Sequence, residues 1–170
     1  MNTLEAILSR RSIRKYTSEK VSDEQIKNLL KAAMFAPSAR NEQPWHFIVI
    51  NQKPLLEALS RVHPYGKMLK EAPLAILVCA DEMLEPATGY WVLDCAAATQ
   101  NILLAAHSMG LGTVWLGIYP REDRIKGIRE LTKLPEHIHP VSLIAIGHPS
   151  EIPMQPQRFK IDRIRYNFWE

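Results

Sequence analysis

The segment from Tyr90 to Met109, YWVLDCAAATQNILLAAHSM, constrains the fold of this chain more than any other. Its length and apolar spacing predict the longest helix of the chain, ended by Gly110 as a C-cap. Most of its circumference is apolar, and it has small side chains that allow close backbone approach: Ala96, Ala97, Ala98, Ala105 and Ala106. A helix that is apolar nearly all round is either central in its own domain or shared with a partner. In a chain of 170 residues we favour burial at the interface of a homodimer.

Strand-like and helix-like segments alternate along the chain, although the connections between them vary in length. Apolar runs predict strands at residues 45–50, 74–80, 113–119 and 142–149. Helical spacing predicts helices at 4–8, 22–36, 55–62, 67–72 and 122–131. Ser22 and Gln25 form a capping box at the start of the second helix. We therefore predict an α+β fold with a mixed, mainly antiparallel sheet flanked by helices, in one domain over residues 1–170.

Composition and charge argue against several classes of function. The chain is 46% apolar and 23% charged, as is usual for a globular protein, and its net charge of +3 is too small to indicate a nucleic-acid or membrane surface. No apolar run approaches the roughly 20 residues that span a bilayer, and the charged beginning predicts no leader peptide. Cys79 and Cys95 lie in apolar segments, so we expect two buried thiols of a cytoplasmic protein rather than a disulfide.

A short basic strip, RRSIRKY at residues 10–16, indicates an anion site. If the strip is extended, the two-residue period places Arg10, Ser12 and Arg14 on one side of the backbone. Two guanidiniums and a hydroxyl that face one way form a donor set suited to a phosphate. A solvated charge run is the alternative, and the strip alone does not separate the two.

A proline-bounded loop at residues 37–44 precedes the first predicted strand. Its Ser38, Asn41 and Gln43 have short polar side chains that both donate and accept hydrogen bonds. A ligand with a phosphate at one end and a polar heterocycle at the other would use both the strip and this loop, and flavin mononucleotide (FMN) is such a ligand. Alternatively, the loop is a plain connection whose polar side chains satisfy backbone groups.

Side chains that perform chemistry themselves are not grouped in this sequence. His137 and His139 form a pair with no cluster of carboxylates or cysteines beside it in the sequence, so we expect no metal site. The glycines of GLGTVWLG, residues 110–117, miss the dinucleotide spacing, although a strand glycine such as Gly117 is typical of close ligand approach. We therefore predict no catalytic side chain and a bound cofactor that supplies the chemistry.

Taken together, these segments resemble the nitroreductase family, whose members are FMN-dependent homodimeric oxidoreductases. RRSIRKY resembles the family's amino-terminal phosphate segment, and PSARNEQPWHFIVI resembles its PS-x-x-N-x-QPW-x-F loop and strand. KMLKEAPLAILVCAD, the long helix with GLGTVWLG, and IGHPSE follow in the family's order, so the resemblance covers essentially the whole chain. It implies a mixed sheet wrapped by helices and two FMN sites across a dimer interface.

By matching positions, the resemblance also implies which residues bind FMN. At the phosphate and ribityl chain it places Arg10, Ser12 and Arg14, with Arg11 acting through its backbone. From the other subunit it brings the loop residues Pro37, Ser38, Ala39, Asn41 and Gln43. It places Lys67 at the pyrimidine edge of the flavin and Arg158 at the phosphate. Leu116 and Gly117 lie near the reactive N5 in this assignment.

The resemblance implies an enzyme that uses NADH or NADPH to reduce nitroaromatics, quinones or similar electron-poor small molecules, by a ping-pong exchange of two electrons. A flavin-binding carrier or sensor without turnover is the alternative. A nucleic-acid-binding domain is disfavoured, because no aromatic platform accompanies the basic strip. The short segment 81–90 replaces a long insertion of the larger family members, so the resemblance does not identify the electron acceptor. We expect Tyr65, Tyr90 and Trp91 to be packing aromatics.

Overall fold

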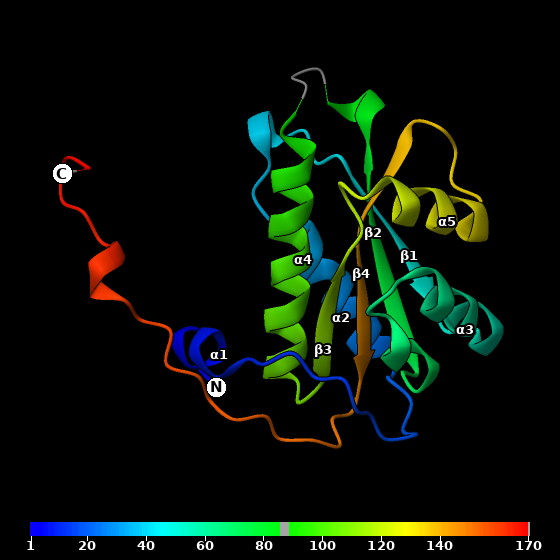
Figure 1. The fold of residues 1–170 in the computed structure, drawn as a ribbon, viewed down its shortest axis with the longest axis horizontal. Coiled ribbons are helices and arrows are strands. Elements are labelled where there is room, and N and C mark those ends of the chain that lie inside the picture. Colours follow the sequence, from blue (N-terminus) through cyan, green and yellow to red (C-terminus); the bar gives the residue numbers. More distant parts are fainter. Residues whose placement is uncertain (86–88, 170) are drawn as a thin grey trace.

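The computed structural model describes residues 1–85 and 89–169; residues 86–88 of the short segment 81–90 lie outside the described residues. An antiparallel sheet forms the centre, with the strands in the order β1-β2-β4-β3 (Figure 1). The strands are β1 (Trp45–Ile50), β2 (Leu74–Asp81), β3 (Gly112–Gly117) and β4 (Ile138–Gly147). Within the described ranges, parallel pairing is limited to an isolated bridge between Ser12 and Thr113. The predicted α+β class and mainly antiparallel sheet are confirmed.

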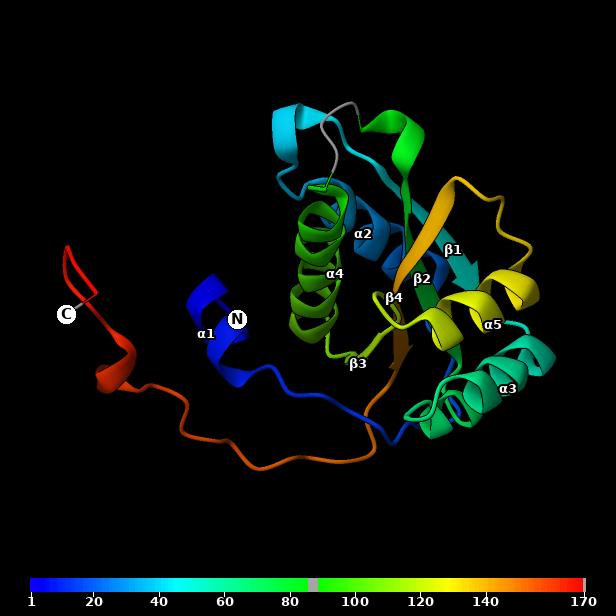
Figure 2. The same cartoon turned by 45° about the horizontal axis from the view of Figure 1, so that its top comes forward.

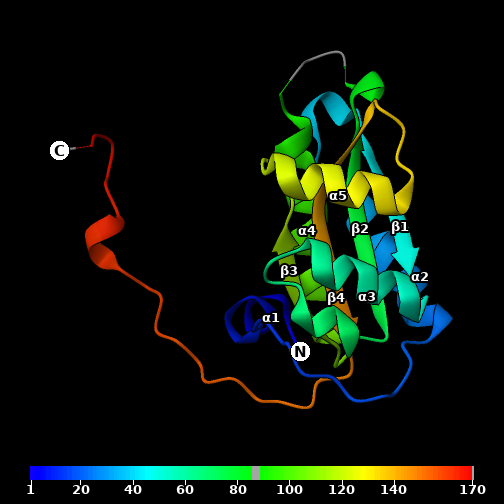
Figure 3. The same ribbon diagram turned by 45° about the vertical axis from the view of Figure 1, so that its right-hand side comes forward.

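Helices cover both faces of this sheet. They are α1 (Thr3–Ser9), α2 (Asp23–Met34), α3 (Lys53–Val62), α4 (Trp91–Ser108) and α5 (Glu122–Thr132). Figures 2 and 3 show α2 and α4 on one face and α3 and α5 on the other. Ile76 and Val78 of β2 pack in the cluster under α2 and α4, whereas Leu77 and Cys79 pack in the cluster under α3 and α5. The near-continuous apolar run of β2 therefore reflects burial on both faces.

The helix ends follow the signals in the sequence. Ser22 caps α2 through its side chain, which accepts from the Gln25 N–H at 3.2 Å, while the Gln25 side chain accepts from the Ser22 N–H at 2.9 Å. The helix ends at Met34, two residues before the predicted end at residue 36. Gly110, with φ of 76°, follows the end of α4, as the C-cap prediction requires.

Helix α4 occupies the centre of its face of the sheet. Its Cys95, Ala98 and Ile102 are fully enclosed, and burial raises the pKa of the Cys95 thiol far above its ordinary value. The predicted buried thiols are confirmed, because both cysteines are free and buried. A central position is thus established for this helix, while Leu93 on its outer side is 65% exposed and leaves apolar surface uncovered.

The chain beyond β4 leaves the body of the molecule. Residues 151–169 leave the sheet and pass α1, where the Gln155 amide donates to the Leu8 carbonyl, before they extend outward with one short helical turn at Ile161–Arg163 (Figures 1 and 3). This segment, hereafter the tail, carries large apolar side chains that are almost fully exposed: Ile152, Met154, Phe159, Tyr166, Phe168 and Trp169. Such a row of apolar side chains marks an interaction surface. In the described part of the chain, no helix has both the length and the apolar character to cross a membrane.

Candidate cofactor site

The basic strip is clamped between the ends of β3 and β4. The Ile13 N–H donates to the Thr113 carbonyl at 2.9 Å, and the Ser150 N–H donates to the Lys15 carbonyl at 3.0 Å. Ile13 is buried, and its neighbours Ser12 and Arg14 turn outward. The extended alternation predicted for the strip therefore holds, and the sheet edge fixes its direction.

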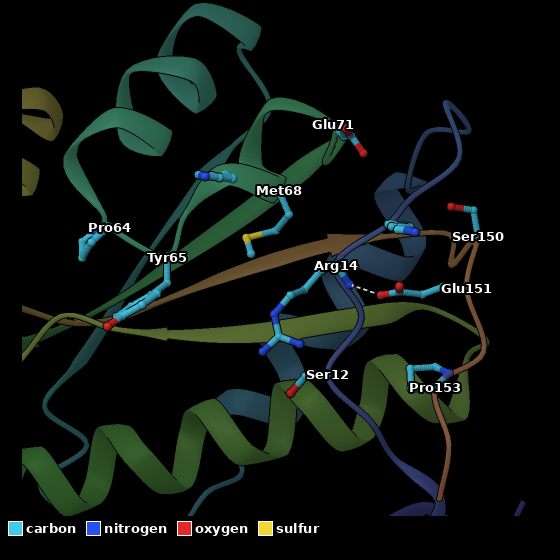
Figure 4. A pocket seen from close by; sticks show the side chains of 11 residues that line it. Ser12, Arg14, Pro64, Tyr65, Met68, Glu71, Ser150, Glu151 and Pro153 are labelled. Carbon is cyan, nitrogen blue, oxygen red and sulfur yellow. Dashed lines mark hydrogen bonds between the residues drawn. The ribbon is translucent and has the colours of Figure 1, made fainter.

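A cavity of about 1050 Å³ lies against the outward side of the strip (Figure 4). It is lined by Ser12, Arg14, Lys15, Pro64, Tyr65, Lys67, Met68, Glu71, Ser150, Glu151 and Pro153. Figure 4 shows the Arg14 side chain turned into this space beside Ser12. Three of the residues predicted to bind the cofactor, Ser12, Arg14 and Lys67, thus meet on one cavity. Its size suits a heterocyclic ligand.

Glu151 holds the backbone of Arg14 and leaves the guanidinium of Arg14 available to a ligand. One carboxylate oxygen of Glu151 accepts from the Arg14 N–H at 2.6 Å (Figure 4). The acid thus holds the main chain rather than the guanidinium, which makes no ion pair with any described residue. Sequence reasoning missed Glu151, because the two residues are 137 positions apart.

A second group of cations lies at the start of the strip. Burial lowers the pKa of the Arg10 guanidinium, and the charges of Arg158 and Arg11 lower it further. Arg158, a residue of the tail, is thus one of the charges that act on Arg10. The Nε atom of Arg11 is buried and has no hydrogen-bond partner among the described residues. Repelling guanidiniums and an unpartnered donor are the conditions that a bound anion relieves.

The loop residues predicted from the sequence lie elsewhere. Pro37, Ser38, Ala39, Asn41 and Gln43 surround a short helical turn (Ala39–Asn41) beside the amino-terminal end of α4 (Figure 1). None of them lines the cavity at the strip. The structure therefore does not bring the strip and the loop of one chain together.

His63 connects the segment that carries Lys67 to the end of β3. Its Nδ1 accepts from the Tyr65 N–H at 3.2 Å, so the proton sits on Nε2, which donates to the Gly117 carbonyl at 2.9 Å. Burial is the main cause that lowers the pKa of His63, which keeps the imidazole neutral. Arg124 donates to the same carbonyl at 2.7 Å. No local pattern in the sequence indicated a role for these two side chains.

The remaining predicted residues and aromatics differ in exposure. Leu116 is buried, and a Cβ added at Gly117 would meet no atom within 4 Å. Tyr65, 70% exposed, lines the cavity and lies under the Arg124 guanidinium, so it is not a core aromatic. Trp91, in contrast, stacks on His139 with ring centroids 5.2 Å apart, as a packing aromatic does.

Fold and site together define an α+β protein with a cationic cavity suited to an anionic, heterocyclic ligand. A model of the Nitroreductase family matches residues 7–64 and 54–148. The chain belongs to the nitroreductase family, and the resemblance seen in its sequence is confirmed.

Relatives extend this match over the whole chain. A protein of Methanothermobacter thermautotrophicus, provisionally named NADH dehydrogenase/NAD(P)H nitroreductase, is 54% identical over 169 residues, which are 99% of this chain and 88% of the relative. The oxygen-insensitive NADPH nitroreductase of Salmonella typhimurium is 32% identical over a match that covers 89% of this chain and 67% of the relative. A crystal structure from Desulfovibrio desulfuricans, provisionally named a nitroreductase and solved with FMN, has a TM-score of 0.86 at 34% identity and covers 100% of this chain and 99% of its own.

Proposed function

We propose that this chain is an FMN-dependent oxidoreductase that passes two electrons at a time from NAD(P)H to electron-poor acceptors such as nitroaromatics and quinones. The enzyme class and both cofactors are those of its family. The observation that carries the proposal is the meeting of Ser12, Arg14 and Lys67, from distant parts of the sequence, on one cavity of about 1050 Å³.

The residues present fit FMN. The phosphate is assigned to the start of the strip, where Arg10 and Arg158 repel each other and Arg11 has an unpartnered Nε. The heterocycle is assigned to the large cavity, where Lys67 offers a cation to its pyrimidine edge and Ser12 and Arg14 face the ribityl chain. When bound there, FMN supplies the two-electron chemistry.

The chain itself contributes binding, orientation and a protected pocket. Lys67 places positive charge where the ligand gains electrons, and Arg14 orients the ligand beside it. The hydrogen bond from His63 to the Gly117 carbonyl connects the segment that carries Lys67 to the end of β3. We assign no side chain to a general acid or base. In a single pocket NAD(P)H and the acceptor bind in turn, which makes the kinetics ping-pong. Reduced, buried thiols suit a cytoplasmic location.

The functional unit is a homodimer in this proposal, built from two single-domain chains. The exposed apolar tail and the outer side of α4 need a covering surface. The loop at residues 37–43 lies away from the cavity of its own chain. In this proposal it lines the cofactor of the other copy. A closed two-fold assembly satisfies both needs with one interface.

The proposal predicts a yellow protein that purifies as a dimer with about one FMN per chain and oxidises NAD(P)H when a quinone is added. Double-reciprocal plots should give parallel lines, because one substrate leaves before the other enters the shared pocket. Steady-state absorbance at the nicotinamide band measures the rate of NAD(P)H oxidation, from which the double-reciprocal plots are drawn. Intersecting lines contradict the shared pocket, and tight FMN binding without any turnover favours a carrier or sensor.

Changing Arg10 to Ala should weaken binding of FMN about thirtyfold and leave riboflavin almost unaffected, since only FMN carries the phosphate. A charge-assisted contact of this kind is worth about 2 kcal/mol. Fluorescence titration of the flavin-free dimer gives both affinities. Arg61→Ala is a matched control, because Arg61 is an exposed arginine of α3 that does not line the cavity. Equal losses for FMN and riboflavin in the Arg10 variant would assign the arginine to folding.

A further inference from the structure

The loop after α2 has an energetically unfavourable backbone. Arg40, Asn41 and Gln43 have φ of 51°, 58° and 53°. These values lie in the left-handed region, which glycine adopts freely and other residues rarely do. Asparagine tolerates this conformation better than arginine or glutamine. Such a backbone persists only where its surroundings hold it in place, and it is found where a site needs a fixed geometry.

Two kinds of contact hold this loop. Within it, the Gln43 N–H donates to the Ser38 hydroxyl at 3.1 Å, and the Gln43 amide donates to the Asn41 side chain at 3.1 Å. From outside, Asp94 on the first turn of α4 accepts the Ala39 N–H with both carboxylate oxygens, at 3.1 and 3.2 Å. This contact anchors the loop to the best-buried helix of the molecule.

Asp94 is a costly residue to place there. It is 6% exposed and forms no ion pair with any described residue. Burial raises its pKa, the hydrogen bond from Ala39 lowers it, and the charge of Glu85 raises it. An apolar side chain would fill the space at lower cost, because a buried carboxylate needs compensation. Among the described residues, the backbone N–H of Ala39 is the hydrogen-bond donor that compensates the Asp94 carboxylate.

We propose that Asp94 is a positioning residue for the cofactor: it holds the Ser38–Gln43 loop in the strained backbone that presents Ser38, Asn41 and Gln43 to the flavin heterocycle of the other subunit. The inference rests on the proposed function. It assigns to the amino-terminal end of α4 a second task besides packing, because one end of the helix then sets the geometry of the shared site.

Two variants break the same bond from its two ends. Asp94→Leu removes the acceptor, and Ala39→Pro removes the donor at a position whose preceding residue, Ser38, is already extended as proline requires. In the flavin-free dimer, each should weaken FMN and riboflavin alike by at least about tenfold, because the loop contacts the ring that both ligands share. The visible absorption band of the bound flavin should shift. Asp94→Asn keeps one oxygen acceptor and should restore affinity to within about threefold.

A further change tests the strain itself. Arg40 is exposed, and glycine adopts its backbone conformation without penalty. Arg40→Gly should therefore recover several-fold affinity in the Asp94→Leu protein and change little in the unaltered protein. Asp94→Leu or Ala39→Pro dimers that bind both flavins normally, or that lose FMN alone, would overturn the inference. An unaltered protein that binds neither flavin would instead overturn the proposed function.

Discussion

A chain that ends at Pro156 is expected to fold, to be monomeric and to lose FMN. The removed part contributes no buried side chain among the described residues, yet it carries Arg158 and exposed apolar groups such as Phe159, Tyr166 and Trp169. Fully burying one such side chain stabilises an interface by about 1.5–3 kcal/mol. Losing only two of them should raise the dimer dissociation constant at least ~100-fold. Sedimentation velocity and flavin absorbance measure the two losses.

Two full-length variants separate the contributions of the tail. Arg158→Ala keeps the apolar side chains, so it should stay dimeric and lose affinity for FMN but not for riboflavin. Phe159→Ala combined with Trp169→Ala keeps the cation and should weaken the dimer. A truncated chain that remains a dimer with one FMN per chain would place the interface elsewhere and leave the exposed tail without a role.

Local patterns predicted the strands, the helices and the strip, although not every bound: β4 begins at Ile138, four residues before the predicted start at 142. The strand at 45–50 has the predicted bounds, and Ser22 and Gln25 form the predicted capping box. The two-residue period predicted Arg10, Ser12 and Arg14 on one side; Ser12 and Arg14 do line one cavity, whereas Arg10 is not among its lining residues. These predictions succeed because they depend on residues next to one another in the chain, where sterics and burial act directly.

Contacts between distant segments were beyond that reasoning. Asp94 and the Ala39 amide are 55 positions apart, and His63 and the Gly117 carbonyl are 54 apart. Their side chains carry no local signal, because a buried acid or histidine shows its partner only after the chain has folded. The left-handed backbone at Arg40 was equally hidden, since no glycine marks it.

Substitution of two glycines of β3 by alanine should have different effects on the free energy of unfolding, although both changes should weaken FMN binding. At Gly112 an added Cβ would lie 2.7 Å from Ile13 Cγ2 and 2.8 Å from its Cβ. Ile13 is branched and tied by its N–H to the Thr113 carbonyl, so relief requires the whole strip to move. Gly112→Ala should therefore lower the free energy of unfolding by about 1–3 kcal/mol and weaken FMN, because overpacking displaces Ser12 and Arg14. Urea denaturation and fluorescence titration measure both effects.

Gly117→Ala is the matched substitution. Apart from Gly117 and its chain neighbours, no atom of the described residues lies within 4 Å of the added Cβ, so the free energy of unfolding should stay within about 0.5 kcal/mol of the unaltered value. The described residues therefore do not require glycine at position 117, and we propose that a ligand approaching the strand does. FMN affinity should fall tenfold or more, because a methyl group in a packed contact costs about 1–3 kcal/mol. Normal flavin binding by a stable Gly117→Ala protein would move the flavin away from this strand and remove Leu116 and Gly117 from the site.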